Sequence, residues 1–195
     1  MGRIIFDAAT TINGWIADER DSLDWLFEVE QGAEPDPGIG LPTDATVLVA
    51  GSTTYEWMVA QLELLEHPER WRESYGRAVL FVFTSRALET PPGLDVRLVS
   101  GPVEGRLPAI RAAAGGGDVW LLGGGDLLGQ FLDADALDVL ALSIAPAALP
   151  AGAPLLPRRV GADRLRLVEA RAVGQFARVV YEVRADASAR QQPAR

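Results

Sequence analysis

Three short segments of the sequence place glycine or hydroxyl side chains directly after an apolar run, at the point where a strand would end. The runs cover residues 45–50, 77–83 and 118–122. The residues that follow them are Gly51, Ser52, Thr53 and Thr54; Thr84, Ser85 and Arg86; and Gly123, Gly124, Gly125 and Asp126. Glycine lets a backbone approach a ligand closely, and hydroxyl groups can donate hydrogen bonds to phosphate oxygens.

The position of these segments predicts what they bind. In open α/β sheets, ligands lie outside the carboxyl ends of the strands. The first and third segments also lead into residues with helical spacing, and the free N–H groups at a helix start attract phosphate. Each segment alone is equally typical of a turn or a helix cap. Their repetition at three strand ends is what favours a site for a phosphate-rich ligand such as a dinucleotide.

Other nucleotide and metal motifs are absent from the sequence. The three glycines lack the G-x-G-x-x-G spacing and follow a late strand, and the chain has no lysine for a Walker motif. There is no cysteine, which excludes disulfides and thiolate sites. The single histidine, His67, stands in a charged segment and is expected at the surface. We therefore expect no metal site.

Charge and hydropathy limit the partners. The net charge is −9 and all 18 cationic residues are arginines, which disfavours a broad surface for nucleic acid or anionic membranes. No apolar run has the length of a membrane span, and the N-terminus does not resemble a secretory signal. These features predict a cytoplasmic protein that binds a small molecule.

The order of apolar runs predicts one α/β domain over residues 1–185, followed by a polar tail, 186–195. We expect strands within residues 3–11, 45–51, 77–85, 94–101, 118–125 and 137–146, and helices within 22–32, 52–62, 102–117 and 126–135. Residues 32–42 are rich in proline and glycine and predict a loop, whereas 66–76 predict a polar surface excursion in which Trp71 serves a lid or an interface. Alternating strands and helices favour a mostly parallel sheet flanked by helices. Residues 164–185 predict a terminal antiparallel hairpin that turns near Gly174.

The motif order resembles the dihydrofolate reductase-like superfamily, in the branch of the reductase domain of riboflavin biosynthesis proteins (the RibD C-terminal domain). The matching segments are TTINGWIA (10–17), VLVAGSTTYEWM (47–58), FVFTSR (81–86) and the block that begins VWLLGGGDLLGQFL (119–132). The resemblance implies the dihydrofolate reductase-like fold, NADPH as hydride donor and a homodimer that pairs through its sheet.

The resemblance also implies roles for individual residues. Gly51 to Thr54 would contact the pyrophosphate and the adenosine ribose, and Thr84 to Arg86 the 2′-phosphate. The glycines Gly123 to Gly125, with Asp126, Leu127 and Leu128, would lie under the pyrophosphate and the nicotinamide ribose, and one peptide bond of the glycine pair would be cis. Ala9, Ile16 and Ala17 would border the nicotinamide.

Two residues depart from this pattern. Ser52 stands where dihydrofolate reductases usually have an arginine for the 2′-phosphate, so that Arg86 is the nearest replacement. Asp126 places a negative charge at a helix start near phosphates, where it could cap the helix but would not attract a pyrophosphate.

The substrate side offers two carboxylates as proton donors. Asp24 lies beside Trp25, whose ring could stack on a flat heterocycle and raise the pKa of the carboxyl. Asp7, within an apolar strand, is the rival, because a buried aspartate needs a partner or a function. Asp24 is equally typical of a carboxylate at a helix start.

These observations predict an NADPH-dependent reductase acting on a small planar heterocycle or a carbonyl or imine compound. One alternative is a non-catalytic dinucleotide-binding or sensor protein of the same fold. Another is a dimerisation module in which the glycines serve only as turns.

Overall fold

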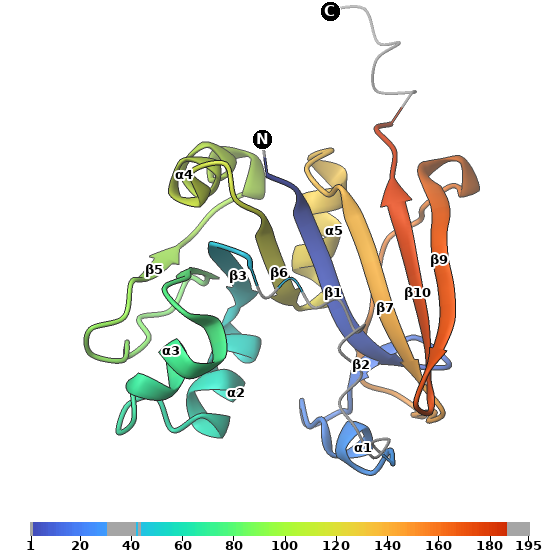
Figure 1. The fold of residues 1–195 in the computed structure, drawn as a ribbon, viewed down its shortest axis with the longest axis horizontal. Helices are drawn as coiled ribbons and strands as arrows, with labels where there is room; N and C mark the ends of the chain where they lie inside the picture. Colours follow the sequence, from blue (N-terminus) through green and yellow to red (C-terminus); the bar gives the residue numbers. More distant parts are fainter. Residues whose placement is uncertain (1, 31–41, 43, 187–195) are drawn as a thin grey trace, which may run out of the picture.

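The computed structural model describes residues 2–30, 42 and 44–186. Almost all of the predicted loop at 32–42 and of the polar tail at 186–195 therefore lies outside the described residues. The remaining chain is built around one eight-stranded sheet with the order β5-β4-β3-β6-β1-β7-β10-β9 (Figure 1). Its strands are β1 (Ile4–Thr11), β3 (Val47–Gly51), β4 (Val79–Phe83), β5 (Val96–Val99), β6 (Val119–Gly123), β7 (Val139–Ala145), β9 (Leu165–Val173) and β10 (Phe176–Val183).

The strand directions confirm the predicted sheet. The first six strands of that order pair in parallel, and β10 pairs antiparallel with both β7 and β9. The hairpin turns at Gly174, which has a φ of 54° that glycine adopts readily. Figure 1 shows this hairpin at the red end of the sheet, beside β7.

Helices cover the two faces of the sheet because side chains alternate along each strand. Leu48 and Leu80 face one way and pack against α2 (Ser52–Gln61) and α3 (Glu69–Tyr75). Val47 and Phe81 face the other way, toward α4 (Leu107–Ala114) and α5 (Gly125–Asp133). Short 3₁₀ turns precede α4 at Val103–Gly105 (η1) and β9 at Ala162–Arg164 (η2).

The segment 66–76 corrects a prediction. It was expected to be a surface excursion, but it contains α3, and Trp71 is only 3% exposed within the core beside α2. The Trp71 indole donates a hydrogen bond to the carbonyl of Ala78 at 3.2 Å. Trp71 is therefore a core residue and not a lid or interface residue.

Three short elements lie near the carboxyl end of β1. The helix α1 (Asp24–Phe27) is followed by Val29, which packs with it against the end of β7. The strands β2 (Trp15–Ala17) and β8 (Ala153–Pro154) form a separate two-stranded antiparallel sheet. The sequence did not predict this pair, since each strand is too short for a periodic pattern.

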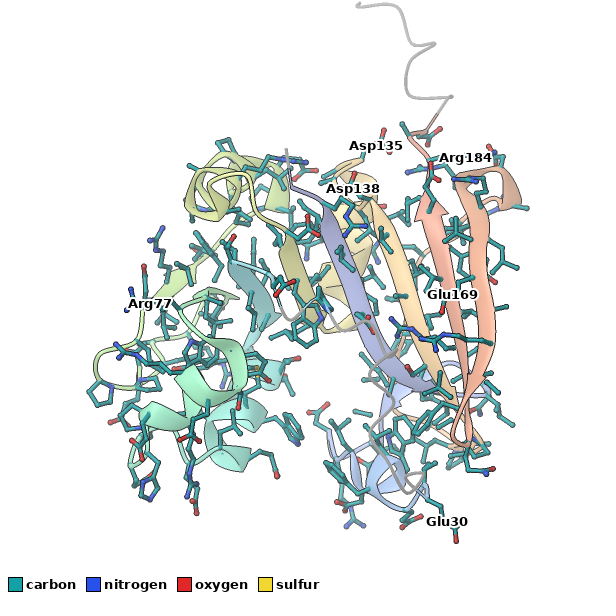
Figure 2. The ribbon with its side chains drawn as sticks, in the orientation of Figure 1. Glu30, Arg77, Asp135, Asp138, Glu169 and Arg184 are labelled. Atoms are coloured by element: carbon teal, nitrogen blue, oxygen red, sulfur yellow. The ribbon has the colours of Figure 1, made fainter. Side chains whose placement is uncertain are left out.

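Charged residues tie the opposite end of the sheet together. Asp138 accepts a hydrogen bond from the Ile4 N–H at 2.7 Å, and Asp135 accepts one from Arg164 at 2.7 Å. Figure 2 shows Asp135, Asp138 and Arg184 gathered at this end, away from α1 and β2. Among the described residues, no helix has the length and hydropathy needed to cross a membrane.

Candidate functional site

The three predicted segments lie at the ends of neighbouring strands. In the sheet, β4 lies next to β3, and β3 lies next to β6. Gly51 pairs with Phe83, the residue before Thr84, and Ala50 pairs with Gly123. The glycines and hydroxyl groups that are far apart in the sequence therefore lie together at the carboxyl ends of β3, β4 and β6. We call this end of the sheet the glycine edge.

Two helices begin at this edge on opposite faces of the sheet. Gly51 precedes α2 and Gly124 precedes α5, each in an extended conformation and without a side-chain hydrogen bond that caps the helix. Adjacent strands whose connections leave to opposite faces form the switch point at which α/β sheets bind ligands. The uncapped N–H groups and the positive ends of both helices face this point.

The edge has space at the positions where a ligand would approach. A Cβ atom placed on Gly51 or on Gly124 would meet no atom within 4 Å. The two helix starts are in close contact, because a Cβ on Gly123 would lie 3.2 Å from Oγ1 of Thr54. The peptide bond between Gly123 and Gly124 is cis, as the resemblance implied.

Gly125 is a glycine for a different reason. A Cβ atom there would lie 2.0 Å from the carbonyl oxygen of Pro154 and 2.7 Å from that of Leu155. The backbone of β8 therefore lies directly against the start of α5, and only glycine leaves room for it.

Asp126 does not face the edge. Its carboxylate accepts hydrogen bonds from the Gln130 amide and from Arg158, both at 2.9 Å, and Arg158 also pairs with Asp133. These hydrogen bonds hold the pKa of Asp126 below its ordinary value. The carboxylate does not cap α5, and its pairing with Arg158 agrees with the expectation that it would not attract a pyrophosphate.

The side chains of Leu127 and Leu128 are 6% and 0% exposed and belong to the core. Only their backbone atoms can contribute to a site. Sequence reasoning placed them at the ligand because of the motif to which they belong, whereas their side chains stabilise the helix that carries it.

Arg86 is held by a carboxylate. Its two terminal nitrogens donate to Glu56 on α2 at 3.0 and 2.5 Å, and these hydrogen bonds raise the pKa of the guanidinium. The Arg86 N–H is bonded to Oγ1 of Thr84 at 2.9 Å, and Ser85 is exposed. The predicted pairing of Arg86 with a 2′-phosphate would require this bidentate contact to break.

The loop between β1 and β2 is held by two buried threonines that the sequence analysis did not single out. Thr10 and Thr11 are 2% and 1% exposed. Oγ1 of Thr10 donates to the carbonyl of Trp15 at 3.0 Å, and Oγ1 of Thr11 accepts from the N–H of Trp15 at 2.9 Å. Two threonines at the end of an apolar strand could have indicated this role, because buried polar groups need hydrogen-bond partners.

The same loop is joined to the glycine edge through β8. Ala17 pairs with Ala153, and the Leu155 N–H donates to the carbonyl of Gly14 at 2.9 Å. Since β8 also contacts Gly125, the predicted nicotinamide-bordering residues Ile16 and Ala17 are connected to the start of α5 by one short strand.

The strand β1 separates from β6 as it approaches this loop. The ladder between them ends at Phe6 and Leu121, whereas the ladder between β1 and β7 continues to Thr11 and Ala145. The half-buried Ala9 lies beyond the point of separation. The predicted nicotinamide neighbours therefore share the end of β1 and the loop that follows it.

Asp7 has a structural partner. Its carboxylate receives two hydrogen bonds from Arg178 on β10, at 2.6 and 2.5 Å, and the two side chains are 2% and 3% exposed. Burial raises the pKa of Asp7, and the hydrogen bonds from Arg178 oppose that change. The prediction that Asp7 contacts substrate is wrong, because both carboxylate oxygens are used by a buried guanidinium.

Asp24 and Trp25 do not form the predicted pair of acid and stacking platform. Asp24 is exposed, and its N–H is bonded to Oγ of Ser22 at 3.0 Å. Trp25 is 7% exposed and packs with Val29 and Ala145. The structure therefore does not give the Asp24 carboxyl the apolar surroundings that the proposed acid required.

The described residues offer no better site for a dinucleotide or for a metal ion. A hollow of about 510 Å³ lies between α2 and residues 88–89, but four glutamates line it, which disfavours an anionic dinucleotide. Among the described residues, no group of three or more acidic or histidine side chains could hold a metal ion.

Comparison with known families decides the relationship. The model of the RibD C-terminal domain matches residues 76–178, which is more than half of the chain. The chain belongs to the RibD C-terminal domain family. The match includes β4, the glycine block of β6 and α5, and most of the terminal hairpin.

Other proteins are similar to this chain in sequence or in fold. The uncharacterized protein YwjB of Bacillus subtilis (strain 168) is 29% identical over 177 residues, which are 89% of this chain and 93% of that protein. A putative riboflavin biosynthesis protein from Shewanella sp. PV-4 has a TM-score of 0.73 and 24% identity, over 95% of this chain and 100% of that one. The dihydrofolate reductase of Enterococcus faecalis, solved in complex with NADP(H), has a TM-score of 0.56 and 16% identity, over 94% and 97% of the two chains. These likenesses establish the dihydrofolate reductase-like fold predicted from the sequence.

Proposed function

We propose that this protein is an NADPH-dependent reductase that transfers a hydride to a small planar heterocycle or to a carbonyl or imine compound. One observation carries the proposal. Two helices that start from adjacent strands, on opposite faces of the sheet, present uncapped N-termini to one open edge. This arrangement suits the pyrophosphate of a dinucleotide.

The residues at the edge fit such a cofactor. Ser52, Thr53 and Thr54 would hold the pyrophosphate and the adenosine ribose through backbone N–H and hydroxyl groups. Gly124 leaves space for the pyrophosphate, since a Cβ there would meet no atom within 4 Å. Thr84 and Ser85 stand one strand further along the edge and would face the adenosine.

The other end of the cofactor would lie at the end of β1. A reduced nicotinamide supplies the hydride when bound, and the protein contributes position and exclusion of water. Ala9, Ile16 and Ala17 would border the ring with small or apolar side chains, and β8 ties their loop to α5. This apolar border favours a flat, uncharged substrate ring beside the nicotinamide.

We propose that solvent supplies the proton for the reduced substrate. Asp7 is engaged by Arg178, and Asp24 faces water. A positioned acid typically contributes about 10²- to 10⁴-fold to a rate, so Asp24→Asn tests the point. We expect turnover to change by less than about threefold, and a hundredfold loss would return the acid role to Asp24.

Consumption of NADPH tests the reductase proposal. The purified protein is mixed with NADPH and a panel of pterins, aminopyrimidines, quinones and small imines, and the absorbance of the reduced nicotinamide is followed. Turnover with at least one compound is expected. Saturable binding of NADPH with no turnover would favour a dinucleotide sensor, and absence of binding would indicate that the glycines serve only as turns.

We also propose that the chain forms a homodimer through the outer strand β9. Leu167 and Val168 on this edge strand are 53% and 50% exposed, and unpaired edge strands tend to pair with another chain. Sedimentation should show a dimer that the substitution Val168→Arg converts to monomer. A monomer at micromolar concentration of the wild-type protein would contradict this.

A further inference from the structure

One segment, residues 152–158, contacts both the loop region at the end of β1 and the start of α5. At its first residue, a Cβ atom placed on Gly152 would lie 2.0 Å from the carbonyl oxygen of Ala17. Two residues later, the carbonyl oxygen of Pro154 occupies the space that a Cβ on Gly125 would need. We call this segment the strap. It joins the two regions that the proposed dinucleotide would contact at its nicotinamide and at its pyrophosphate.

Two glycines let the strap lie against α5. Gly125 and Gly129 are four residues apart, so they share one face of the helix, and both are buried. A Cβ atom on Gly129 would lie 2.9 Å from Cγ of Arg158. The strap therefore runs close to the helix backbone from the start of α5 to its second turn.

The side chain of Arg158 fastens the strap to this face. Its Nη2 donates to Asp126 and its Nε to Asp133, and its Nη1 donates to the carbonyl of Pro157, all at 2.9 Å. The two aspartates are seven residues apart, which is a rise of about 10 Å along a helix. The guanidinium crosses Gly129 between them. Every nitrogen of the guanidinium has an acceptor, so the side chain is held in one position.

The strap is joined to β2 on its other side. The Leu155 N–H donates to the carbonyl of Gly14 at 2.9 Å, and Ala153 pairs with Ala17. A displacement of the strap from α5 would therefore move Ile16 and Ala17, which we propose border the nicotinamide.

The exposure of the ion pairs separates position from stability. The side chains of Arg158, Asp126 and Asp133 are 30%, 68% and 53% exposed. Ion pairs exposed to this extent contribute little to the free energy of unfolding, because water screens them. Their geometry can still set where the strap lies, since one guanidinium bridges two turns of the helix.

We infer that Arg158 is a positioning residue for the nicotinamide end of the cofactor site. It acts through the strap and the β2–β8 pair, which hold Ile16 and Ala17 at a fixed distance from the start of α5. The inference rests on the proposed function, because it needs a dinucleotide at the glycine edge. Loss of Arg158 should weaken contacts with the nicotinamide and leave those with the pyrophosphate and the adenosine.

The test compares NADPH with 2′-phospho-ADP-ribose, which lacks the nicotinamide, in calorimetric titrations of the full chain. The wild-type protein should bind NADPH more tightly. Arg158→Ala should weaken NADPH binding about tenfold, because β2 must then be ordered on binding, and change binding of the shorter ligand by less than about twofold. Arg159→Ala is the matched control, since Arg159 is the next residue and is exposed. It should change neither constant.

A second variant keeps the arginine and removes its partners. Asp126→Asn combined with Asp133→Asn should reproduce the selective loss of NADPH affinity, and it decides the matter if Arg158→Ala does not fold. In both variants, the Leu155 amide should exchange its hydrogen faster than in the wild-type protein without any ligand, because the strap is less firmly held.

The remaining outcomes count against the inference. Equal losses of affinity for the two ligands, or no loss for either, would overturn it, because a positioning residue for the nicotinamide must act on NADPH alone. Equal affinities of the wild-type protein for the two ligands would overturn it as well. If the wild-type protein binds neither ligand, the proposed function itself fails.

Discussion

The glycine edge of the sheet and the region around β1 differ in what builds them. At the edge, Gly51 and Gly124 leave backbone N–H groups uncapped and space open. Within β1 and beside its carboxyl end, side chains form closed contacts instead: Asp7 with Arg178, and Trp25 with the apolar residues around it. A ligand site made of backbone is therefore specified by topology, whereas contacts between side chains depend on partners that are distant in the sequence.

The largest effect is expected from breaking the buried ion pair. Asp7→Ala leaves the Arg178 guanidinium buried without its partner, which should lower the free energy of unfolding by about 3–5 kcal/mol. Urea denaturation measures this. The double variant Asp7→Leu with Arg178→Met should recover most of the loss, because it removes both charges. Wild-type stability in the single variant would mean that Asp7 is not held as described.

The close approach of β8 predicts the next largest effect. Gly125→Ala places a methyl group against the carbonyl of Pro154, and overpacking of this kind costs about 1–3 kcal/mol. Gly51→Ser is the control, since its side chain enters open space and can cap α2. Equal unfolding midpoints for the two variants would argue against the contact between β8 and α5.

Sequence separation explains which features could be predicted from the sequence. An apolar strand that is followed directly by glycine and hydroxyl residues is a pattern of neighbouring residues. The sheet and the glycine edge at residues 51–54 and 123–125 could therefore be predicted from the sequence. The partner of Asp7 stands 171 residues away, and that of Asp126 stands 32 residues away. No spacing rule relates such residues, so the sequence did not predict either ion pair. The β2–β8 pair was missed because so few residues form it.

A negative charge placed at the glycine edge should weaken NADPH binding without lowering the stability of the protein. Gly51→Asp can cap α2, which should leave stability equal or higher by a few tenths of a kcal/mol. Its carboxylate would repel a pyrophosphate and weaken NADPH binding by about 10- to 100-fold. Gly51→Asn is the isosteric neutral control. Equal affinities for the Asp and Asn variants would show that the pyrophosphate lies elsewhere.

The smallest effect on NADPH binding is expected at Asp126. This residue carries the same negative charge as the Gly51→Asp variant, but its carboxylate is paired with Arg158. Asp126→Asn should change NADPH affinity by less than about twofold, because the carboxylate faces Arg158. Since folding lowers the pKa of Asp126, its small contribution to stability is present at neutral pH. It is lost as the pH falls through the folded-state pKa. The two proteins should therefore differ slightly at pH 7 and converge in acid, and a large gain in affinity would contradict the position of the carboxylate.

The central claim is that a dinucleotide binds where α2 and α5 begin. Nuclear magnetic resonance of the nitrogen-labelled protein tests it directly, by following backbone amide signals during a titration with NADPH. We predict saturable shifts that are largest at Ser52, Thr53, Gly124 and Gly125. Saturable shifts confined to other parts of the sheet, or no shifts at all, would contradict the claim.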